Sequence, residues 1–165
     1  MFTSTICSCN IIKNNAPVII KELVPYLWAS MILHITKTIP GNTPTYASRA
    51  SGNIGLIMYD SIVNGYPNYA SMQNQLNGLT IIEKPASGKK YNWTIALNAG
   101  QAHILKNIYA HTSDENKKKI DSLENEILQQ LSNKNENDDI TNLSVQYGRS
   151  IANSIFKWSK TDGGH

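Results

Sequence analysis

The chain has 165 residues, of which 41% are hydrophobic and 16% charged, and its formal net charge is +3. This length is typical of one domain and is enough to bury a hydrophobic core. Only two residues are arginines, and the one lysine cluster, residues 117–119, lies among acidic residues. That pattern indicates a solvated helix face and argues against a nucleic-acid-binding surface. No apolar run reaches the roughly 18 residues that a transmembrane helix needs, so we expect no membrane span.

The first 15 residues show no periodicity and predict a disordered tail. Within it, Ile6-Cys7-Ser8-Cys9 is similar to a bacterial lipobox, in which Cys9 would be lipidated. The five residues before it are too few for the apolar region of a signal peptide. Two interpretations stay open: a lipoprotein of the periplasm or cell envelope whose signal lies upstream, or a tail with two ordinary thiols. Cys7 and Cys9 are a poor pair for a stabilising disulfide and lack the further ligands of a zinc site.

Residues 16–165 are predicted to form one helical domain, because apolar residues recur at helical spacing in several segments. The first helix is expected to begin at about Pro17 or Leu23 and to end at about Lys37, with Pro25 as a kink or a restart. The second is expected to begin at Pro44 and to end at about Asn64.

Small side chains are frequent along the second predicted helix. Ser51, Gly52 and Gly55 would let another helix approach closely. We therefore predict that this helix is the central packing helix of the domain.

Residues 66–92 have no strong periodicity and contain several turn signals, which predicts one long irregular connection. Further helices are expected over residues 93–110, 113–132 and 139–160. The second of these opens with Thr112-Ser113-Asp114-Glu115, which predicts a capping box. Since no alternation typical of strands is found, the predicted fold class is all-α, a bundle of about five main helices.

Five segments spread along the chain carry a resemblance to a known family. They are residues 26–28 (YLW), 38–44 (TIPGNTP), 47–52 (ASRASG), 56–63 (LIMYDSIV) and 150–165 (SIANSIFKWSKTDGGH). This pattern resembles the N-terminal helices of vanadium-dependent haloperoxidase-like proteins, within the type 2 phosphatidic acid phosphatase superfamily. The resemblance implies that residues 16–165 are the N-terminal part of a longer protein.

The family's phosphate or vanadate site is built from three motifs, KxxxxxxRP, PSGH and SRxxxxxH. Their Lys and Arg residues hold an oxyanion, while one His protonates the leaving group and another attacks or ligates. None of the three occurs in this sequence. Asp162-Gly163-Gly164-His165 is superficially similar to the second motif but lacks its Pro and Ser, so we assign no catalytic role to His165. Vanadate would belong to the full-length family, and we expect no catalytic, cofactor or metal site in this chain itself.

Four other polar residues have structural interpretations. Arg49 could contact a carboxylate or the rest of a longer protein, but we favour a half-buried side chain paired with Asp60 or Glu22. Three histidines lack the spacing of ligands that share a metal along one helix, and we interpret them as packed or helix-end residues. These are His34, His103 and His111.

Two functions from different classes follow. The first is the scaffold part of a haloperoxidase-like or acid-phosphatase-like protein, lacking the catalytic motifs, whose partner would be the C-terminal catalytic half. The alternative is a free-standing all-α binding or structural module without enzymatic activity. Without the catalytic half we expect self-association, because the second and fifth helices would present apolar surface that this chain cannot fully cover, including Phe156 and Trp158.

Overall fold

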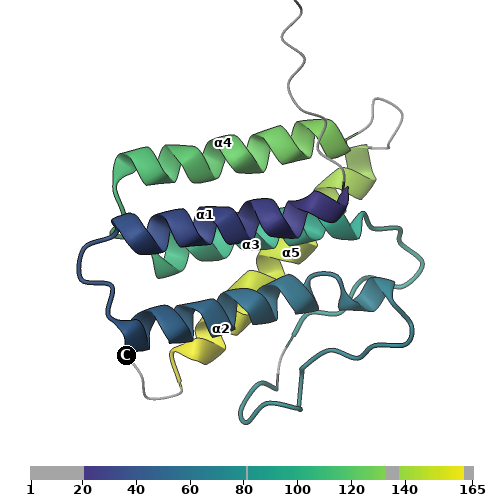
Figure 1. The fold of residues 1–165 in the computed structure, drawn as a ribbon. Coiled ribbons are helices and arrows are strands. Elements are labelled where there is room, and N and C mark those ends of the chain that lie inside the picture. The colour runs from purple at the N-terminus through teal and green to yellow at the C-terminus, as the bar shows by residue number, and fades with distance from the viewer. Residues whose placement is uncertain (1–20, 81, 133–137, 162–165) are drawn as a thin grey trace, which may run out of the picture.

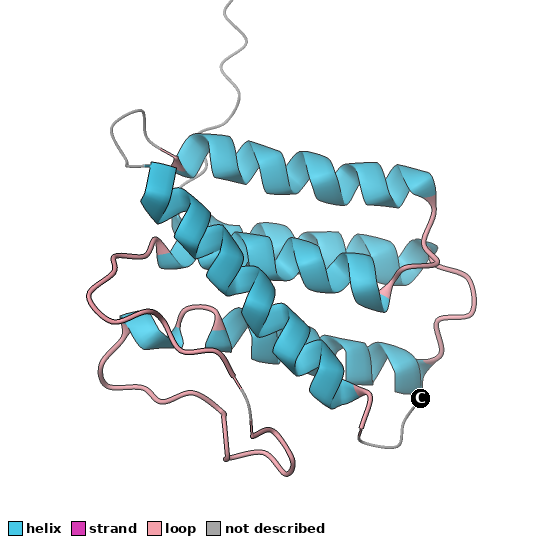
Figure 2. Ribbon diagram, turned by 180° about the vertical axis from the view of Figure 1, so that it is seen from behind, coloured by secondary structure: helices cyan, strands magenta, loops and turns pink. Residues whose placement is uncertain are grey.

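The structure is a computed structural model that describes residues 21–80, 82–132 and 138–161. Within these ranges all regular structure is helical (Figure 2). Five α-helices follow one another along the chain, and short 3-10 turns precede α1 and follow α2. The helices are α1 (Val24–Thr38), α2 (Pro44–Asp60), α3 (Trp93–Ile108), α4 (Asp114–Leu131) and α5 (Asp138–Ser159). The predicted all-α fold with five main helices is confirmed.

The helices form a bundle in which α4 and α2 lie at opposite edges (Figure 1). Helices α1 and α3 lie between these two edges, and α5 crosses the far side of the bundle (Figures 1 and 2). Helix α3 packs against all four other helices, and its longest contact is with α5. The core therefore sits around α3.

The prediction that the second helix would be central is wrong. Helix α2 buries only Ala50, Ile54, Ile57 and Asp60, whereas ten consecutive or nearly consecutive residues of α3 are buried. Helix α3 can be buried on most of its circumference because its buried polar residues have partners. Asn98 Nδ2 donates to the backbone oxygen of Glu124 at 2.9 Å, and Gln101 Nε2 donates to that of Ile54 at 3.1 Å.

Close helix contact is made by glycines other than those expected. A Cβ atom added at Gly148 of α5 would overlap the carbonyl group of Ala96 in α3. One added at Gly100 would lie 2.9 Å from Ser61 Oγ and 3.1 Å from the Gly148 oxygen. By contrast, nothing lies within 4 Å of the Cβ positions of Gly52 and Gly55. Gly52 and Gly55 of α2 are thus not used for close packing among the described residues.

The helix ends follow the sequence closely. Pro25 lies in the first turn of α1, where its missing N–H costs no hydrogen bond. Thr43 caps α2 by accepting from the Tyr46 N–H. The predicted capping box of α4 is not formed, because Ser113 rather than Thr112 is the N-cap and accepts from the Asn116 N–H. Thr112 is buried instead, and its hydroxyl accepts from Asn116 Nδ2 at 2.8 Å.

The long connection between α2 and α3 is held at several points. Helix α2 ends at Asp60, earlier than expected, and the irregular segment that follows buries Leu79 and Ile82. Trp158 Nε1 of α5 donates to the Asn77 oxygen at 3.0 Å. We expected Trp158 and Phe156 to add apolar surface that this chain does not fully cover, and each of them keeps part of its surface exposed. Both are half-buried, and the Lys160 ammonium lies 4.2 Å from the centre of the Phe156 ring.

Candidate functional site

The structure does not gather the histidines into a metal site. His34 Nε2 lies 3.2 Å from Asn116 Oδ1 and 3.2 Å from Lys119 Nζ. His103 Nε2 lies 2.8 Å from Asn153 Oδ1, and His111 is exposed after the end of α3. Over the described ranges, no group of three or more His, Cys, Asp and Glu side chains could hold a metal ion. Cys9 and His165 lie outside the described residues.

Arg49 has a different partner from the two carboxylates that we expected. Its guanidinium donates to the backbone oxygen of Ser159, the last residue of α5. Asp60 lies eleven residues further along α2, about 16 Å at the helical rise of 1.5 Å per residue. Glu22 lies 3.8 Å from Lys21 instead. Arg49 therefore ties the first half of α2 to the end of α5.

A nearly buried carboxylate, Glu124, links three helices. It accepts hydrogen bonds from Lys106 Nζ of α3 and Arg149 Nη2 of α5, both at 3.0 Å. Lys106 also lies 2.6 Å from Asp121. Burial disfavours the charge of Lys106, but its bonds to Asp121 and Glu124 prevail and raise its pKa. Because every charge here is paired, we interpret this cluster as a structural link.

A second acidic group, Asp60, ends α2. Its side chain is fully buried, and Oδ1 accepts from the Met72 N–H at 3.2 Å. Burial raises the pKa of Asp60 despite hydrogen bonds from Ser71 and Met72. Burial likewise raises the pKa of nearby Tyr147 to about 12, although Asn64 donates a hydrogen bond to its hydroxyl. These groups are closed to solvent, and they hold the start of the long connection against α2 and α5.

Three of the hollows on the surface of the described residues lie beside α2 or the aromatic residues that follow it. One of about 510 Å³, at the start of α1 and α3, contains Tyr66 together with the stacked rings of Tyr91 and Trp93. One of about 220 Å³ lies beside Arg49. A third, of about 260 Å³, follows the end of α2 and is lined by Tyr59, Ile62, Val63, Tyr66 and Tyr69. Tyrosine side chains are the feature that all three share.

The most unusual surface is the outer side of α2, which we call the α2 face: Ser48, Gly52, Gly55 and Tyr59, spaced three or four residues apart. The first three are exposed, and Tyr59, near the end of the helix, lines the third hollow. Each glycine in an exposed helix interior costs about 1 kcal/mol relative to alanine. Nothing within the described residues accounts for that cost.

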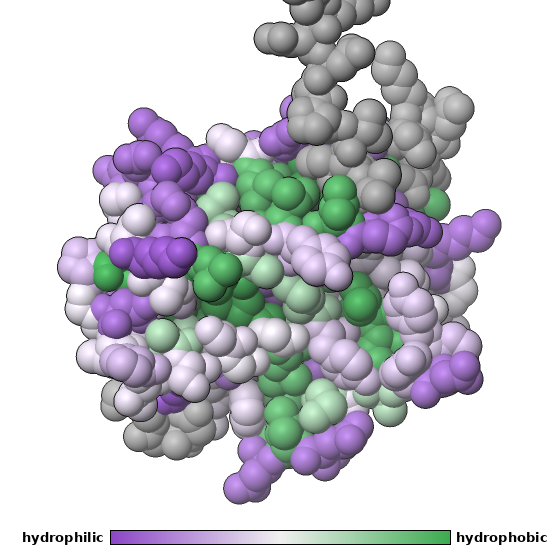
Figure 3. Space-filling model, in the orientation of Figure 1, coloured by the Kyte–Doolittle hydropathy of each residue, from purple (hydrophilic) through white to green (hydrophobic). Residues whose placement is uncertain are grey.

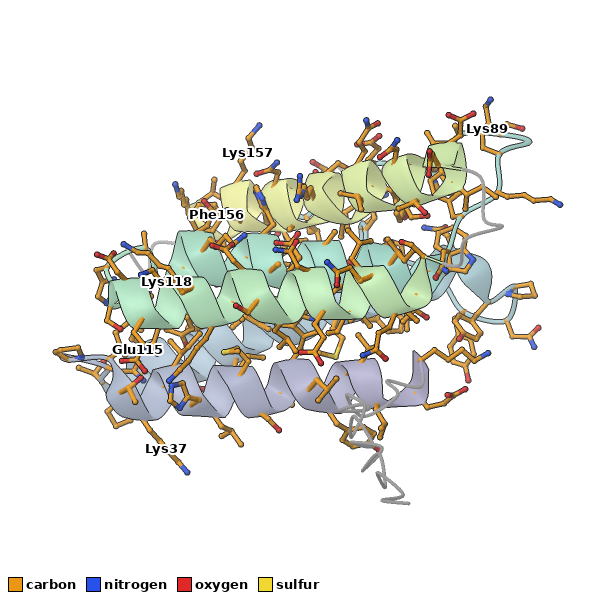
Figure 4. All side chains as sticks on the ribbon, turned by 90° about the horizontal axis from the view of Figure 1, so that it is seen from above. Lys37, Lys89, Glu115, Lys118, Phe156 and Lys157 are labelled. Carbon is orange, nitrogen blue, oxygen red and sulfur yellow. The ribbon has the colours of Figure 1, made fainter. Side chains whose placement is uncertain are left out.

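The α2 face carries no charge. The helix contains just two charged residues, and Arg49 reaches to α5 while Asp60 is buried. Interface cores are depleted of charge and enriched in tyrosine relative to other surfaces. Helix α4 shows the opposite pattern, with eight charged residues among its 18. Figure 3 shows strongly hydrophilic atoms at one end of α4 and a paler surface over α2, and Figure 4 shows Glu115 and Lys118 on α4.

The uncharged surface could have been predicted from the distribution of charged residues along the chain. Residues 23–82 contain three charged residues, whereas residues 83–165 contain 21 of the total of 27. The net charge and the overall percentage do not show this difference. In addition, no helix of the described ranges combines the length and the apolar character needed to cross a membrane.

Taken together, the described residues form a helical bundle with a charge-free face on α2 and with Glu124 paired to Lys106 and Arg149. Its sequence matches no protein-family model and no curated protein. Its fold is similar to a solved structure described as the first bacterial vanadium-dependent iodoperoxidase, with a TM-score of 0.72 and 24% sequence identity. The match covers 90% of this chain and 34% of that chain, so this chain spans about a third of its length. The likeness supports, at the level of fold, the resemblance to part of a vanadium-dependent haloperoxidase.

Arg49, Arg149 and His103 do not together form a site for a vanadate or phosphate oxyanion. Such a group needs several Lys, Arg and His donors that converge on one point. Here Arg149 is paired with Glu124, Arg49 bonds the end of α5, and His103 is paired with Asn153. These three residues have separate partners and do not form one donor set.

Proposed function

We propose that this chain is a non-catalytic helical scaffold within a haloperoxidase-like or acid-phosphatase-like protein. The oxyanion chemistry would be performed by a separate region or polypeptide. The observation that carries the proposal is the fold match, which takes in nearly all of this chain but only a third of the iodoperoxidase chain.

The internal pairing of charge supports this proposal. Preorganised donors aimed at the reacting oxyanion are usually the largest single contribution to catalysis. In the described residues, Glu124 holds two of the cations, Lys106 and Arg149. A role in positioning other helices requires packing surface rather than such donors, and the α2 face supplies it.

The direct test is the genomic sequence that follows the codon of His165. We expect an open reading frame, or an adjacent gene, that encodes the Lys, Arg and His motifs of the oxyanion site. A stop codon without any such gene nearby would favour the alternative, a free-standing helical binding module.

A second test uses the purified chain. Its addition to orthovanadate should leave the ⁵¹V nuclear magnetic resonance spectrum unchanged, and it should not oxidise iodide in the presence of hydrogen peroxide. Vanadate binding at one site, abolished by Arg49→Ala, would contradict the proposal that the chain is non-catalytic.

A further inference from the structure

We propose that Asn77 is a site of spontaneous chemical modification, at which the side-chain amide is lost as ammonia and an aspartate or isoaspartate takes its place. The proposal does not depend on the proposed function. It starts from two identical dipeptides, because the sequence contains Asn-Gly twice, at residues 64–65 and 77–78. Since both dipeptides contain the same two reacting residues, a large difference in their rates must come from the structure around them.

The reaction needs water as its only co-reactant. The backbone nitrogen of the residue after the asparagine attacks the side-chain carbonyl carbon, Cγ. A bond between this nitrogen and Cγ forms, the bond between Cγ and Nδ2 breaks, and the amide proton leaves with the amino group as ammonia. Water then opens the cyclic imide at either carbonyl group, and nothing is oxidised or reduced. A following glycine favours the attack because it has no side chain to hinder the ring and its backbone is the least restricted.

The dipeptide Asn77-Gly78 meets both requirements of this reaction, an accessible backbone N–H and an unrestrained side-chain amide. Both residues are exposed in the long connection between α2 and α3. The Leu79 N–H donates to the Leu76 oxygen at 3.1 Å, which closes a tight turn with the dipeptide at its centre. Within the part of the chain that the structure describes, neither the Gly78 N–H nor the Asn77 side chain makes a hydrogen bond.

The dipeptide Asn64-Gly65 meets neither requirement. The Gly65 N–H donates to the Ile62 oxygen at 2.9 Å, at the end of a 3-10 turn. Asn64 Nδ2 donates to the Tyr147 hydroxyl at 2.8 Å. Gly65 also packs so closely on Trp93 that an added Cβ atom would overlap the ring. The cyclic imide therefore forms here only after two hydrogen bonds and this packing have opened.

Modification of Asn77 changes the contact between the long connection and α5. The backbone oxygen of Asn77 accepts a hydrogen bond from Trp158 Nε1 at 3.0 Å. In isoaspartate this carbonyl group becomes a free carboxylate, and the main chain continues through the former side chain. The new negative charge arises beside a hollow that Gly78, Lys157 and Trp158 line. We therefore expect the hydrogen bond of Trp158 to the connection to weaken.

Incubation of the folded full chain at mildly alkaline pH, below its unfolding temperature, tests the proposal. Peptide mapping by mass spectrometry detects the mass increase that accompanies replacement of NH₂ by OH at each asparagine. We expect Asn77 to convert about tenfold faster than Asn64 or more, because two hydrogen bonds must open first at Asn64. The same incubation in guanidinium chloride is the control. With the fold lost, the two dipeptides should react at similar rates.

Tyr147→Phe is a matched variant, with circular dichroism to establish that it is folded. It removes the hydroxyl that holds the Asn64 side chain, so the rate at Asn64 should rise while that at Asn77 stays the same. In the converted chain, the Trp158 indole N–H should exchange with solvent faster than before. Equal rates at the two asparagines of the folded chain would overturn the proposal, and so would an Asn77 that reacts only in guanidinium chloride.

Discussion

The two edge helices of the bundle, α2 and α4, are similar in length but face solvent in different ways. Helix α4 has eight charged residues, and several form ion pairs along its own surface, such as Lys119 with Glu115 at 2.8 Å. Helix α2 directs Arg49 to α5, buries Asp60 and exposes small uncharged residues. The surface of α4 is of the charged kind that favours contact with water, whereas that of α2 has the small, uncharged side chains more typical of an interface.

The largest effect is expected at Gly148, where two helices are in close contact. Gly148→Ala should destabilise the fold by about 3 kcal/mol or more, because the new methyl group would overlap the Ala96 carbonyl between two tightly packed helices. Urea unfolding followed by circular dichroism measures the change. A loss below about 1 kcal/mol would mean that α3 and α5 can separate easily, contrary to the packing described.

The next effect concerns a charge of α4 that belongs to the core. Glu124→Ala should cost about 1–2 kcal/mol, since it leaves Lys106 and Arg149 without their shared carboxylate, while their partial exposure limits the loss. Urea unfolding again gives the value. The control is Glu126→Ala on the exposed side of the same helix, which should change stability by no more than about 0.5 kcal/mol. Equal losses for the two would refute a structural role for the Glu124 cluster.

A smaller effect of opposite sign is expected on α2. Gly52→Ala should stabilise the fold by up to about 1 kcal/mol in dilute protein, because alanine has the higher helix propensity and its methyl group meets open space. The midpoint of thermal unfolding should rise accordingly. A clear fall would show that Gly52 is already in close contact.

The smallest effect is a dependence on pH. The folded pKa of Asp60 is raised above its ordinary value of 3.8, so the folded state binds this proton more tightly than the unfolded state does. The stability that this group contributes is present below that value and is lost as the pH rises through the folded pKa. Asp60→Asn removes the ionisable group and with it this loss of stability. The free energy of unfolding of the variant, relative to that of the unaltered protein, should therefore increase as the pH rises from 3.8 through the folded pKa of Asp60. Parallel stability curves would contradict the raised pKa.

The periodicity of apolar residues predicted where the helices lie, but it did not predict which helix is central. Ile120 and Ile127 of α4 and Ile151 and Ile155 of α5 are buried, because the apolar stripe that predicts each helix also specifies its buried face. The central position of α3 could not be read in this way, since its buried Asn98 and Gln101 resemble surface residues until their partners are known. The glycines of α2 were predicted to contact another helix of this domain. Their spacing shows that a helix could approach closely, but it does not show which helix does so.

The candidate surface was only partly predictable. Self-association was expected from apolar residues on the second and fifth helices, and the half-burial of Phe156 and Trp158 by contacts with the core could not be read from their spacing. The partner of Arg49 could not be predicted from the sequence either, because Ser159 is 110 residues away and accepts the hydrogen bond through its backbone oxygen. Because every residue has a backbone oxygen, the residue type does not indicate which one accepts a hydrogen bond.

The most direct test of the account's central claim, that this chain is a scaffold without an oxyanion site of its own, is titration of the purified chain with orthovanadate followed by ⁵¹V nuclear magnetic resonance. We predict that the spectrum stays unchanged, because the donors that such an anion needs do not converge in this chain. Vanadate bound at one site, and lost in the Arg49→Ala variant, would contradict the account.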